Sequence, residues 1–229
     1  MHYELGTSGF LYRSDKLMVD KATQSLWNTL QGRPVIGPLV GRDIQLVRRS
    51  VVTTTWGEWR RRHPKTTVLS LRTGFRRDYG EGVAYRDYFA TDELMFSVAI
   101  TDSRLGNKSE ILGLIFDQDA GGSMAIEIEY LRAHPVHHGE LSGQKFVVFT
   151  DGSGAARVYD SAGLMFGRWD GDRTAHDTTG EAWELFEDRI QSDAGRKLRR
   201  LPQHRAFWFG WYAAYPGSEL VRSVTESDE

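Results

Sequence analysis

Cysteine is absent from this chain of 229 residues. Its absence excludes disulfide bonds, catalysis by a thiolate and zinc sites that use cysteine ligands. The chain also lacks a run of about 18 apolar residues, the length that a membrane-spanning helix needs. No charged and then apolar leader opens the sequence. We therefore expect no membrane partner, and for the chain as given we expect a cytoplasmic location.

Charge of one sign is also scarce. The formal net charge is −2 and the isoelectric point is about 6.4, so we expect no basic footprint and no nucleic-acid partner. Two short runs, residues 60–63 and 196–200, are basic. Because scattered arginine and lysine side chains neutralise only single phosphates, both runs are interpreted as solvated faces.

Residues that build a core are well represented. Hydrophobic residues make up 40% of the chain and seven residues are tryptophan, which indicates one large or two small globular domains. β-branched and apolar runs alternate with turn sequences, and one short helix is expected over residues 181–191. The fold class predicted is therefore β-dominated α+β. The predicted strands are residues 51–54, 67–71, 97–100, 111–116, 124–128 and 146–149, with 111–128 forming a hairpin.

An internal duplication is predicted from four anchors that recur in the same order with nearly the same spacing. The anchors pair residues 20–27 with 177–183, 40–44 with 194–198, 55–64 with 207–216, and 65–68 with 217–220. The expected organisation is a first, partial copy over 1–72, an ordered connector over 73–104, a second, more complete copy over 105–222 and a frayed tail over 223–229.

Each copy is expected to end in a short helix that carries Trp-x-x-Trp. Tryptophans at i and i+3 share one helix face, and the proline that follows four residues later stops the helix. Residues Thr53 to Thr55 offer an N-cap to the first helix. The interpretation is that all four tryptophans anchor their helices to a sheet.

Several motifs together resemble a family of prokaryotic proteins of unknown function, the family numbered 3179. These motifs are residues 9–20 followed by 25–27, residues 36–41, Trp56-x-x-Trp59 with His63-Pro64, and residues 73–80. The resemblance spans roughly residues 5–222. It implies no known activity.

The resemblance also implies that this is an N-terminally short member. Members of the family usually begin with a segment that contains a Gly-Gly turn and a Tyr-Cys-Pro-Leu sequence, which would precede Met1. Chemistry that depends on those cysteines is then absent here. In the second copy, residues 134–149 align with the N-terminal segment that other members of the family have in their first copy.

A histidine cluster is the best candidate for a metal site. His134, His137 and His138 lie close together in the sequence with Glu140 nearby, and imidazole with carboxylate suits zinc or copper. The segment precedes a turn and is not a helix that would bring the rings together. Surface or capping histidines are the alternative, and a metal ion is the only cofactor considered.

A second candidate site lies in the connector. Arg76, Arg77 and Tyr79 are candidate ligand-binding residues, because arginine binds carboxylate or phosphate through two parallel hydrogen bonds. Asp15, Arg76, Asp78 and His134 are the candidate catalytic residues of an enzyme whose site lies between the copies. Buried structural hydrogen bonds are the alternative for the connector residues.

Three functions stay open at this point. The first is a module that binds a small anionic ligand or a metal between the copies, the second is an enzyme with a polar site there, and the third is an interaction protein. A metal in the purified protein, a polar cleft near Arg76 or an unpaired strand edge would distinguish them. Because an open sheet edge invites pairing with another chain, a homodimer is also expected.

Overall fold

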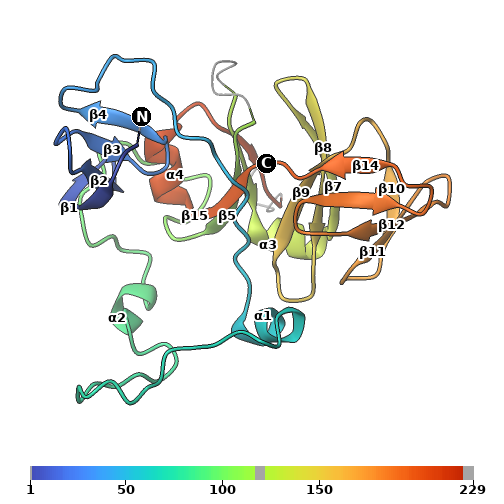
Figure 1. Ribbon diagram of the computed structural model, residues 1–229, viewed down its shortest axis with the longest axis horizontal. Helices are drawn as coiled ribbons and strands as arrows, with labels where there is room; N and C mark the ends of the chain where they lie inside the picture. The colour runs from blue at the N-terminus through green and yellow to red at the C-terminus, as the bar shows by residue number, and fades with distance from the viewer. Residues whose placement is uncertain (1, 117–121, 224–229) are drawn as a thin grey trace.

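The structure is a computed structural model that describes residues 2–116 and 122–223. Strands dominate, and within the described residues they form four sheets accompanied by a few short helices. This confirms the β-dominated class. Figure 1 shows the sheet of the first 36 residues at one end of the molecule and the sheet of residues 166–199 at the other. Residues 224–229, most of the predicted frayed tail, lie outside the described residues.

Sheet A is an antiparallel meander at the start of the chain. It consists of β1 (Leu5–Tyr12), β2 (Asp15–Asp20), β3 (Leu26–Asn28) and β4 (Arg33–Ile36), in that order. Its core is small, with Leu17, Trp27 and Leu39 buried. Strands β1 and β4 are edges of this sheet. A homodimer through one of these edges stays a prediction.

A long, largely exposed segment follows sheet A. Between residues 37 and 109, all of which the structure describes, the regular elements are α1 (Trp56–Arg62) and α2 (Arg86–Phe89). The strands predicted over 51–54, 67–71 and 97–100 are wrong. A β-rich run becomes a strand only when another strand pairs with it, and these runs have no such partner among the described residues.

Sheet B lies at the centre of the molecule. Its strand order is β15 (Gln203–Phe207), β5 (Glu110–Leu114), β6 (Met124–Glu127) and β16 (Glu219–Val221), and β6 leads into α3 (Ile128–Ala133). Strands β5 and β6 are antiparallel, which confirms the predicted hairpin, although the turn over 117–121 lies outside the described residues. Helix α4 (Trp208–Ala214) packs with one face of this sheet through Trp208 and Trp211.

Sheet C is buried on both faces. It consists of β7 (Val136–Leu141), β8 (Gln144–Thr150) and β9 (Ala156–Asp160). Successive side chains of a strand point to opposite faces. Phe146 and Val148 therefore join the core shared with sheet B and α3, whereas Val147 and Phe149 join the core shared with sheet D.

Sheet D is an antiparallel meander of five strands. They are β10 (Phe166–Trp169), β11 (Thr174–Asp177), β12 (Ala182–Leu185), β13 (Arg189–Ser192) and β14 (Lys197–Arg199). The helix predicted over 181–191 is wrong, because β12 and β13 form a hairpin there. Trp183 and Leu185 are buried while Glu184 is exposed, which is the two-residue alternation of a strand.

The two Trp-x-x-Trp helices differ in their environment. Both form, and the Thr55 side chain caps α1 by accepting a hydrogen bond from Glu58 N, as expected. Trp208 and Trp211 of α4 are buried, but Trp56 and Trp59 of α1 are 50% and 43% exposed. The expectation that all four tryptophans anchor a helix to a sheet is therefore wrong for α1.

Candidate functional site

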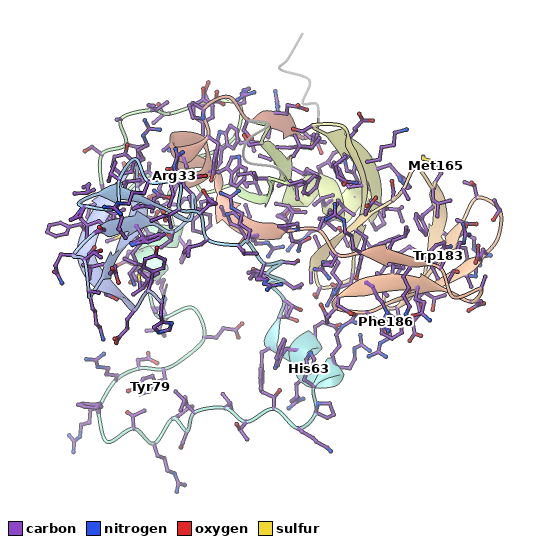
Figure 2. All side chains as sticks on the ribbon, turned by 45° about the horizontal axis from the view of Figure 1, so that its top comes forward. Arg33, His63, Tyr79, Met165, Trp183 and Phe186 are labelled. Carbon is purple, nitrogen blue, oxygen red and sulfur yellow. The ribbon has the colours of Figure 1, made fainter. Side chains whose placement is uncertain are left out.

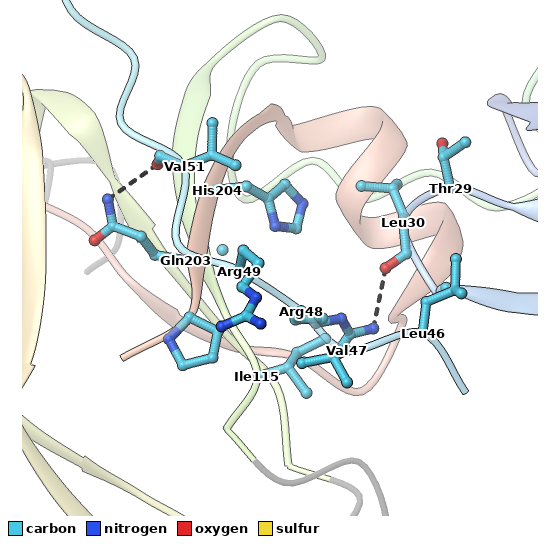
Figure 3. Close-up of a pocket in the computed structure, with 13 residues that line it drawn as sticks. Thr29, Leu30, Leu46, Val47, Arg48, Arg49, Val51, Ile115, Gln203 and His204 are labelled. Atoms are coloured by element: carbon cyan, nitrogen blue, oxygen red, sulfur yellow. Dashed lines mark hydrogen bonds between the residues drawn. The ribbon is translucent and has the colours of Figure 1, made fainter. Parts of the chain in front are cut away.

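A cavity of about 300 Å³ lies between sheet A and sheet B (Figure 3). The segment of residues 46–51 lines it from one side, the β3–β4 connection from another, and β5 and β15 from a third. Most of the lining is apolar, and the charged or titratable side chains are Arg48, Arg49 and His204. The lining residues are Thr29, Leu30, Gly32, Leu46, Val47, Arg48, Arg49, Val51, Gly113, Ile115, Pro202, Gln203 and His204.

Arg48 joins sheet A to α4 at this cavity. Its Nη2 lies 3.0 Å from Leu30 O, 3.3 Å from Gln31 O and 2.9 Å from the Tyr215 hydroxyl. The Tyr215 hydroxyl in turn donates to Leu30 O at 3.0 Å. Arg48 Nη1 is buried and has no hydrogen-bond partner within the described residues. A buried guanidinium nitrogen without an acceptor costs free energy, so this atom is suited to an acceptor from a ligand.

His204 supplies a second unpartnered atom in the lining. Its Nε2 is buried without a hydrogen-bond partner in the part of the chain that the structure describes. Burial, and then the charge of Arg48, lowers the pKa of His204 to about 4, against a smaller raising effect of Asp15. The imidazole is therefore neutral at pH 7. Burial also lowers the pKa of Arg48 and raises that of Tyr215.

The surroundings of the cavity are basic. A larger, open hollow of about 1250 Å³ adjoins it and shares Leu46, Val47, Arg48, Ile115 and Pro202 with its lining. Its charged lining residues are Arg13, Arg33, Arg42, Arg48 and Asp43. Four arginines against one carboxylate favour an anion in this region. In Figure 2, Arg33 lies on the side of sheet A that faces the rest of the molecule.

Arg200 offers a comparison for Arg48, because each stands eight residues before the first tryptophan of a Trp-x-x-Trp sequence. Each also lies at a tyrosine hydroxyl, Arg48 at Tyr215 and Arg200 at Tyr159. Arg200 pairs with the Glu187 carboxylate at 3.5 Å.

Among the described residues, Arg48 has no carboxylate partner within salt-bridge distance. Glu187 stands four residues after the buried Trp183, and the residue four after the buried Trp27 is Gln31. The Arg48 site therefore carries a neutral amide where the Arg200 site carries an acid.

A separate cluster of charges ties α1 to sheets C and D. Arg62 pairs with Glu58 and lies 2.8 Å from Asp172 and 3.8 Å from Asp151. Asp151 also accepts from Arg157 at 3.2 Å. The Arg61 hydrogen bonds, together with those of Arg62, hold the pKa of Glu58 down at about 2 against the effect of burial. Arginines and carboxylates balance within this cluster, so it leaves no net charge for a ligand.

The three candidate metal ligands engage separate partners. His134 Nδ1 lies 2.9 Å from Tyr130 O, His137 Nδ1 lies 3.4 Å from the Tyr130 hydroxyl, and the His138 Nε2 accepts from Phe166 N at 3.1 Å. Burial, and then the charges of His138 and His134, lowers the pKa of His137 to about 4. In the described residues, no group of three or more His, Cys, Asp or Glu side chains is placed to hold a metal ion.

The candidate catalytic residues lie on separate parts of the fold. Asp15, at the start of β2, accepts from Thr29 Oγ1 and Leu30 N. Arg76 and Asp78 lie in the exposed connector, and His134 follows α3. No hydrogen bond or ion pair joins any two of these four residues, all of which the structure describes.

The candidate ligand-binding residues of the connector are exposed. Arg76, Arg77 and Tyr79 all face solvent, and Figure 2 shows Tyr79 on the loop that runs outside the sheets. The Tyr79 hydroxyl lies 2.8 Å from Thr73 Oγ1, and Arg77 lies over the Phe75 ring at 6.0 Å. The structure therefore places these side chains on a surface, with no enclosed site around them among the described residues.

The residues of the cavity were missed by the sequence reasoning. Arg48 is separated from His204 and from Tyr215 by more than 150 positions, so no local motif contains all three. One signal was present, because the alignment of the two Trp-x-x-Trp sequences also pairs Arg48 with Arg200. That recurrence marks a position at which arginine lies at a tyrosine hydroxyl in both halves.

Comparison with protein families gives one result. The family model described as "Protein of unknown function (DUF3179)" matches residues 1–218. The chain belongs to the DUF3179 family. No curated protein and no solved structure matches this DUF3179 chain. The matched residues include Arg48, His204 and Tyr215, and the family description assigns no activity to them. Within the described residues of this DUF3179 protein, no helix is both long and apolar enough to cross a membrane.

Proposed function

We propose that this protein binds a small molecule with a carboxylate and a short apolar body in the cavity between sheets A and B. The observation that carries the proposal is Arg48 Nη1, a buried cationic donor in the cavity lining without a partner among the described residues. A carboxylate oxygen would satisfy this donor and neutralise its charge.

The second half of the chain supports a carboxylate as the acceptor. Arg200, in the corresponding position, has the Glu187 carboxylate at 3.5 Å. Arg48 has the amide Gln31 at the corresponding place, and Gln31 offers it only a backbone carbonyl. An external carboxylate would supply at Arg48 the opposite charge that Glu187 supplies at Arg200, where Nε and Nη2 stay without a hydrogen-bond partner among the described residues.

The lining supports an apolar body for the ligand. Leu30, Leu46, Val47, Val51 and Ile115 form much of the wall around Arg48. Small-molecule sites are mostly apolar with a few polar groups that fix orientation, and they begin at a volume of roughly 300 Å³. A fully hydrated anion such as phosphate would leave this apolar surface unused.

Calorimetric titration with phenylacetate and with the neutral phenylacetamide tests the proposal at pH 7. We expect phenylacetate to bind at least about tenfold more tightly than the amide, because a charge-assisted hydrogen bond contributes about 1.5–3 kcal/mol. Arg48→Gln should remove that preference. Arg60→Gln, which removes an exposed arginine of α1, should leave it unchanged.

Gln31→Glu tests directly whether a carboxylate of the protein can take the place of the ligand. It places a carboxylate at the position that corresponds to Glu187, so it should raise the melting temperature of the free protein and weaken phenylacetate binding. Equal binding of the acid and the amide, or binding that survives in both Arg48→Gln and Gln31→Glu, would refute the proposal.

We infer in addition that the two halves of the chain are related by duplication. Matched geometry in the Trp-x-x-Trp segments supports this. Trp59 Nε1 donates to Thr66 Oγ1 at 3.0 Å, and Trp211 Nε1 donates to Ser218 Oγ at 2.8 Å, each seven residues onward.

The hairpins of sheets A and D support the same inference. Asp20 and Asp177 are buried aspartates that end β2 and β11, and each accepts from the backbone and the hydroxyl of a threonine in the following turn. Trp27 and Trp183 then follow in the next strand and are each 1% exposed. If the two halves are related in this way, residues 51–71 should be able to bind a β-hairpin similar to β5–β6. Binding of such a hairpin can be measured.

A further inference from the structure

Helix α1 presents its aromatic side to solvent and its charged side to the protein. Glu58 and Arg62, four residues apart, have side chains only 13% and 9% exposed and bind toward Asp151 and Asp172. Trp56 and Trp59, three residues apart, remain about half exposed. An ordinary surface helix has the opposite arrangement, with its apolar side against the core.

The chain after α1, which Trp59 Nε1 contacts at Thr66 Oγ1, carries further exposed apolar side chains. Val68, Leu69 and Leu71 are 74%, 93% and 70% exposed, in a run that is β-rich in sequence but forms no strand. We call Trp56, Trp59, Val68, Leu69 and Leu71 the α1 surface. Large apolar side chains that are exposed in this number are typical of an interaction site.

The second half shows what covers the equivalent surface. There β15 pairs with β5, β16 pairs with β6, and α4 lies against the same two strands. Trp211 sits so close to β5 that a Cβ on Gly113 would lie 2.2 Å from its ring. The occupant of the α4 surface is therefore an antiparallel apolar hairpin whose glycine accommodates the second tryptophan.

We propose that the α1 surface docks an antiparallel β-hairpin from another polypeptide, with a glycine opposite Trp59. Residues 51–55 would pair with one strand and residues 66–71 with the other, as β15 and β16 do with β5 and β6. Val51 N donates to Gln203 O and Thr66 N donates to His63 O, whereas residues 52–54 and 67–69 belong to no sheet and keep their backbone donors and acceptors available for such pairing. This mode of recognition, the addition of strands to an open edge, derives its affinity from backbone hydrogen bonds and its specificity from side-chain pockets.

Trp59 itself is prepared for this contact. Its Nε1 donates to Thr66 Oγ1, and its ring lies tilted against the His63 ring, with 4.1 Å between the ring centroids. Trp211 has the same arrangement with Ser218 and Tyr215, at 4.7 Å between the rings. The indole of Trp59 is thus oriented as in the covered helix and needs no new polar partner on docking.

A synthetic hairpin tests the proposal with the full chain. The probe joins the sequences of β5 (Glu110–Leu114) and β6 (Met124–Glu127) through an Asn-Gly turn, which keeps Leu114 opposite Met124 as in sheet B. We expect saturable binding, followed by the fluorescence of the protein's tryptophans. Trp59→Ala should weaken it at least about tenfold, whereas Phe75→Ala, an exposed apolar residue outside the α1 surface, should leave it unchanged.

A second probe carries alanine at the position of Gly113 and should bind far more weakly, because its Cβ would meet the tryptophan ring. Absence of binding by the glycine probe, or equal binding by wild type and Trp59→Ala, would overturn the proposal. Sedimentation velocity of the chain alone tests whether a second copy of the chain covers the α1 surface instead. A dimer that Trp59→Ala abolishes would show that a second copy covers the α1 surface and would also overturn the proposal.

Discussion

Arg48 holds three oxygens with one guanidinium nitrogen and keeps another nitrogen, Nη1, buried without a hydrogen-bond partner among the described residues. Its Nη2 lies within hydrogen-bond distance of Leu30 O, Gln31 O and the Tyr215 hydroxyl. The same side chain therefore joins sheet A to α4 and carries the proposed site for a carboxylate. Because Arg48 serves in both roles, a carboxylate bound to it would also strengthen the contact between sheet A and α4.

His204 makes the stability of the protein depend on pH. Its pKa falls from the ordinary value of 6.5 to about 4 in the folded chain, so between these pH values the unfolded chain binds a proton that the folded chain does not. The free energy of unfolding then falls as the pH is lowered from about 6.5 to about 4, and this contribution changes no further below pH 4. We expect a loss of about 2 kcal/mol between pH 7 and pH 5 from this residue.

Urea unfolding at pH 7 and pH 5 measures the effect. His204→Asn should show a smaller loss than the wild type, and the exposed His2→Asn should show the same loss as the wild type. A pH dependence that is identical in His204→Asn and the wild type would contradict the assignment. His137, with a lowered pKa as well, contributes the part that remains in the variant.

Two glycines around α4 should respond in opposite directions to alanine. Gly113→Ala places a methyl group 2.2 Å from the Trp211 ring, and such overpacking costs about 1–3 kcal/mol or more. Gly210, inside α4, has open space at its Cβ position, so Gly210→Ala should stabilise the protein by up to about 1 kcal/mol. Chemical denaturation of both variants is the measurement, and a shift of the same sign in both would contradict the packing of α4 on β5.

At the scale of elements, the same short helix is used in two ways. Helix α4 buries its tryptophans against sheet B, whereas α1 is held by ion pairs on its other side. The helices share their sequence pattern and their C-terminal geometry. The difference lies in whether a two-stranded hairpin lies beneath them.

Sheet A is the element with the least support from a core. The three clusters of buried hydrophobic residues contain members of sheets B, C and D and of α3 and α4, but none of sheet A. Local opening is easiest where few apolar contacts must break. The carbonyl of Leu30, held by Arg48 and Tyr215, is one of the polar contacts between the β3–β4 connection and the rest of the chain, beside Leu46 N to Gly32 O.

Hydrogen exchange of backbone amides should therefore separate sheet A from the rest of the molecule. We expect amides of β2 and β3 to exchange through openings of lower free energy than those of β8, which is buried on both faces. Trp27→Phe should lower protection in sheet A and leave β8 unchanged. A single opening free energy shared by sheets A and C would contradict this division.

For the whole molecule, the layers explain how distant segments form one site. Sheet A stands at one end and sheets C and D at the other, with sheet B between them. The cavity lies where sheet A meets sheet B, and the α1 surface lies outside this stack of sheets. Small-ligand binding and hairpin docking are thus proposed for different faces, and either can be tested without disturbing the other.

The sequence by itself determined the local chemistry of this protein. The absence of cysteine, the β-rich runs, the turn aspartates Asp20 and Asp177 and the Thr55 cap all act through neighbours within a few residues. The hairpin of β5 and β6 follows from two apolar runs separated by a turn. Such features depend on short-range sterics and hydrogen bonds, which a sequence states directly.

Only the tertiary structure decided which of these runs acquired partners. Residues 67–71 and 124–127 are both β-rich, yet only the second run is a strand, because β5 and β16 pair with it. Likewise, burial of Trp211 and exposure of Trp59 follow from what packs against each helix. The meeting of Arg48, His204 and Tyr215 depends on contacts across more than 150 residues, and pairing and burial of this kind are properties of the folded chain as a whole.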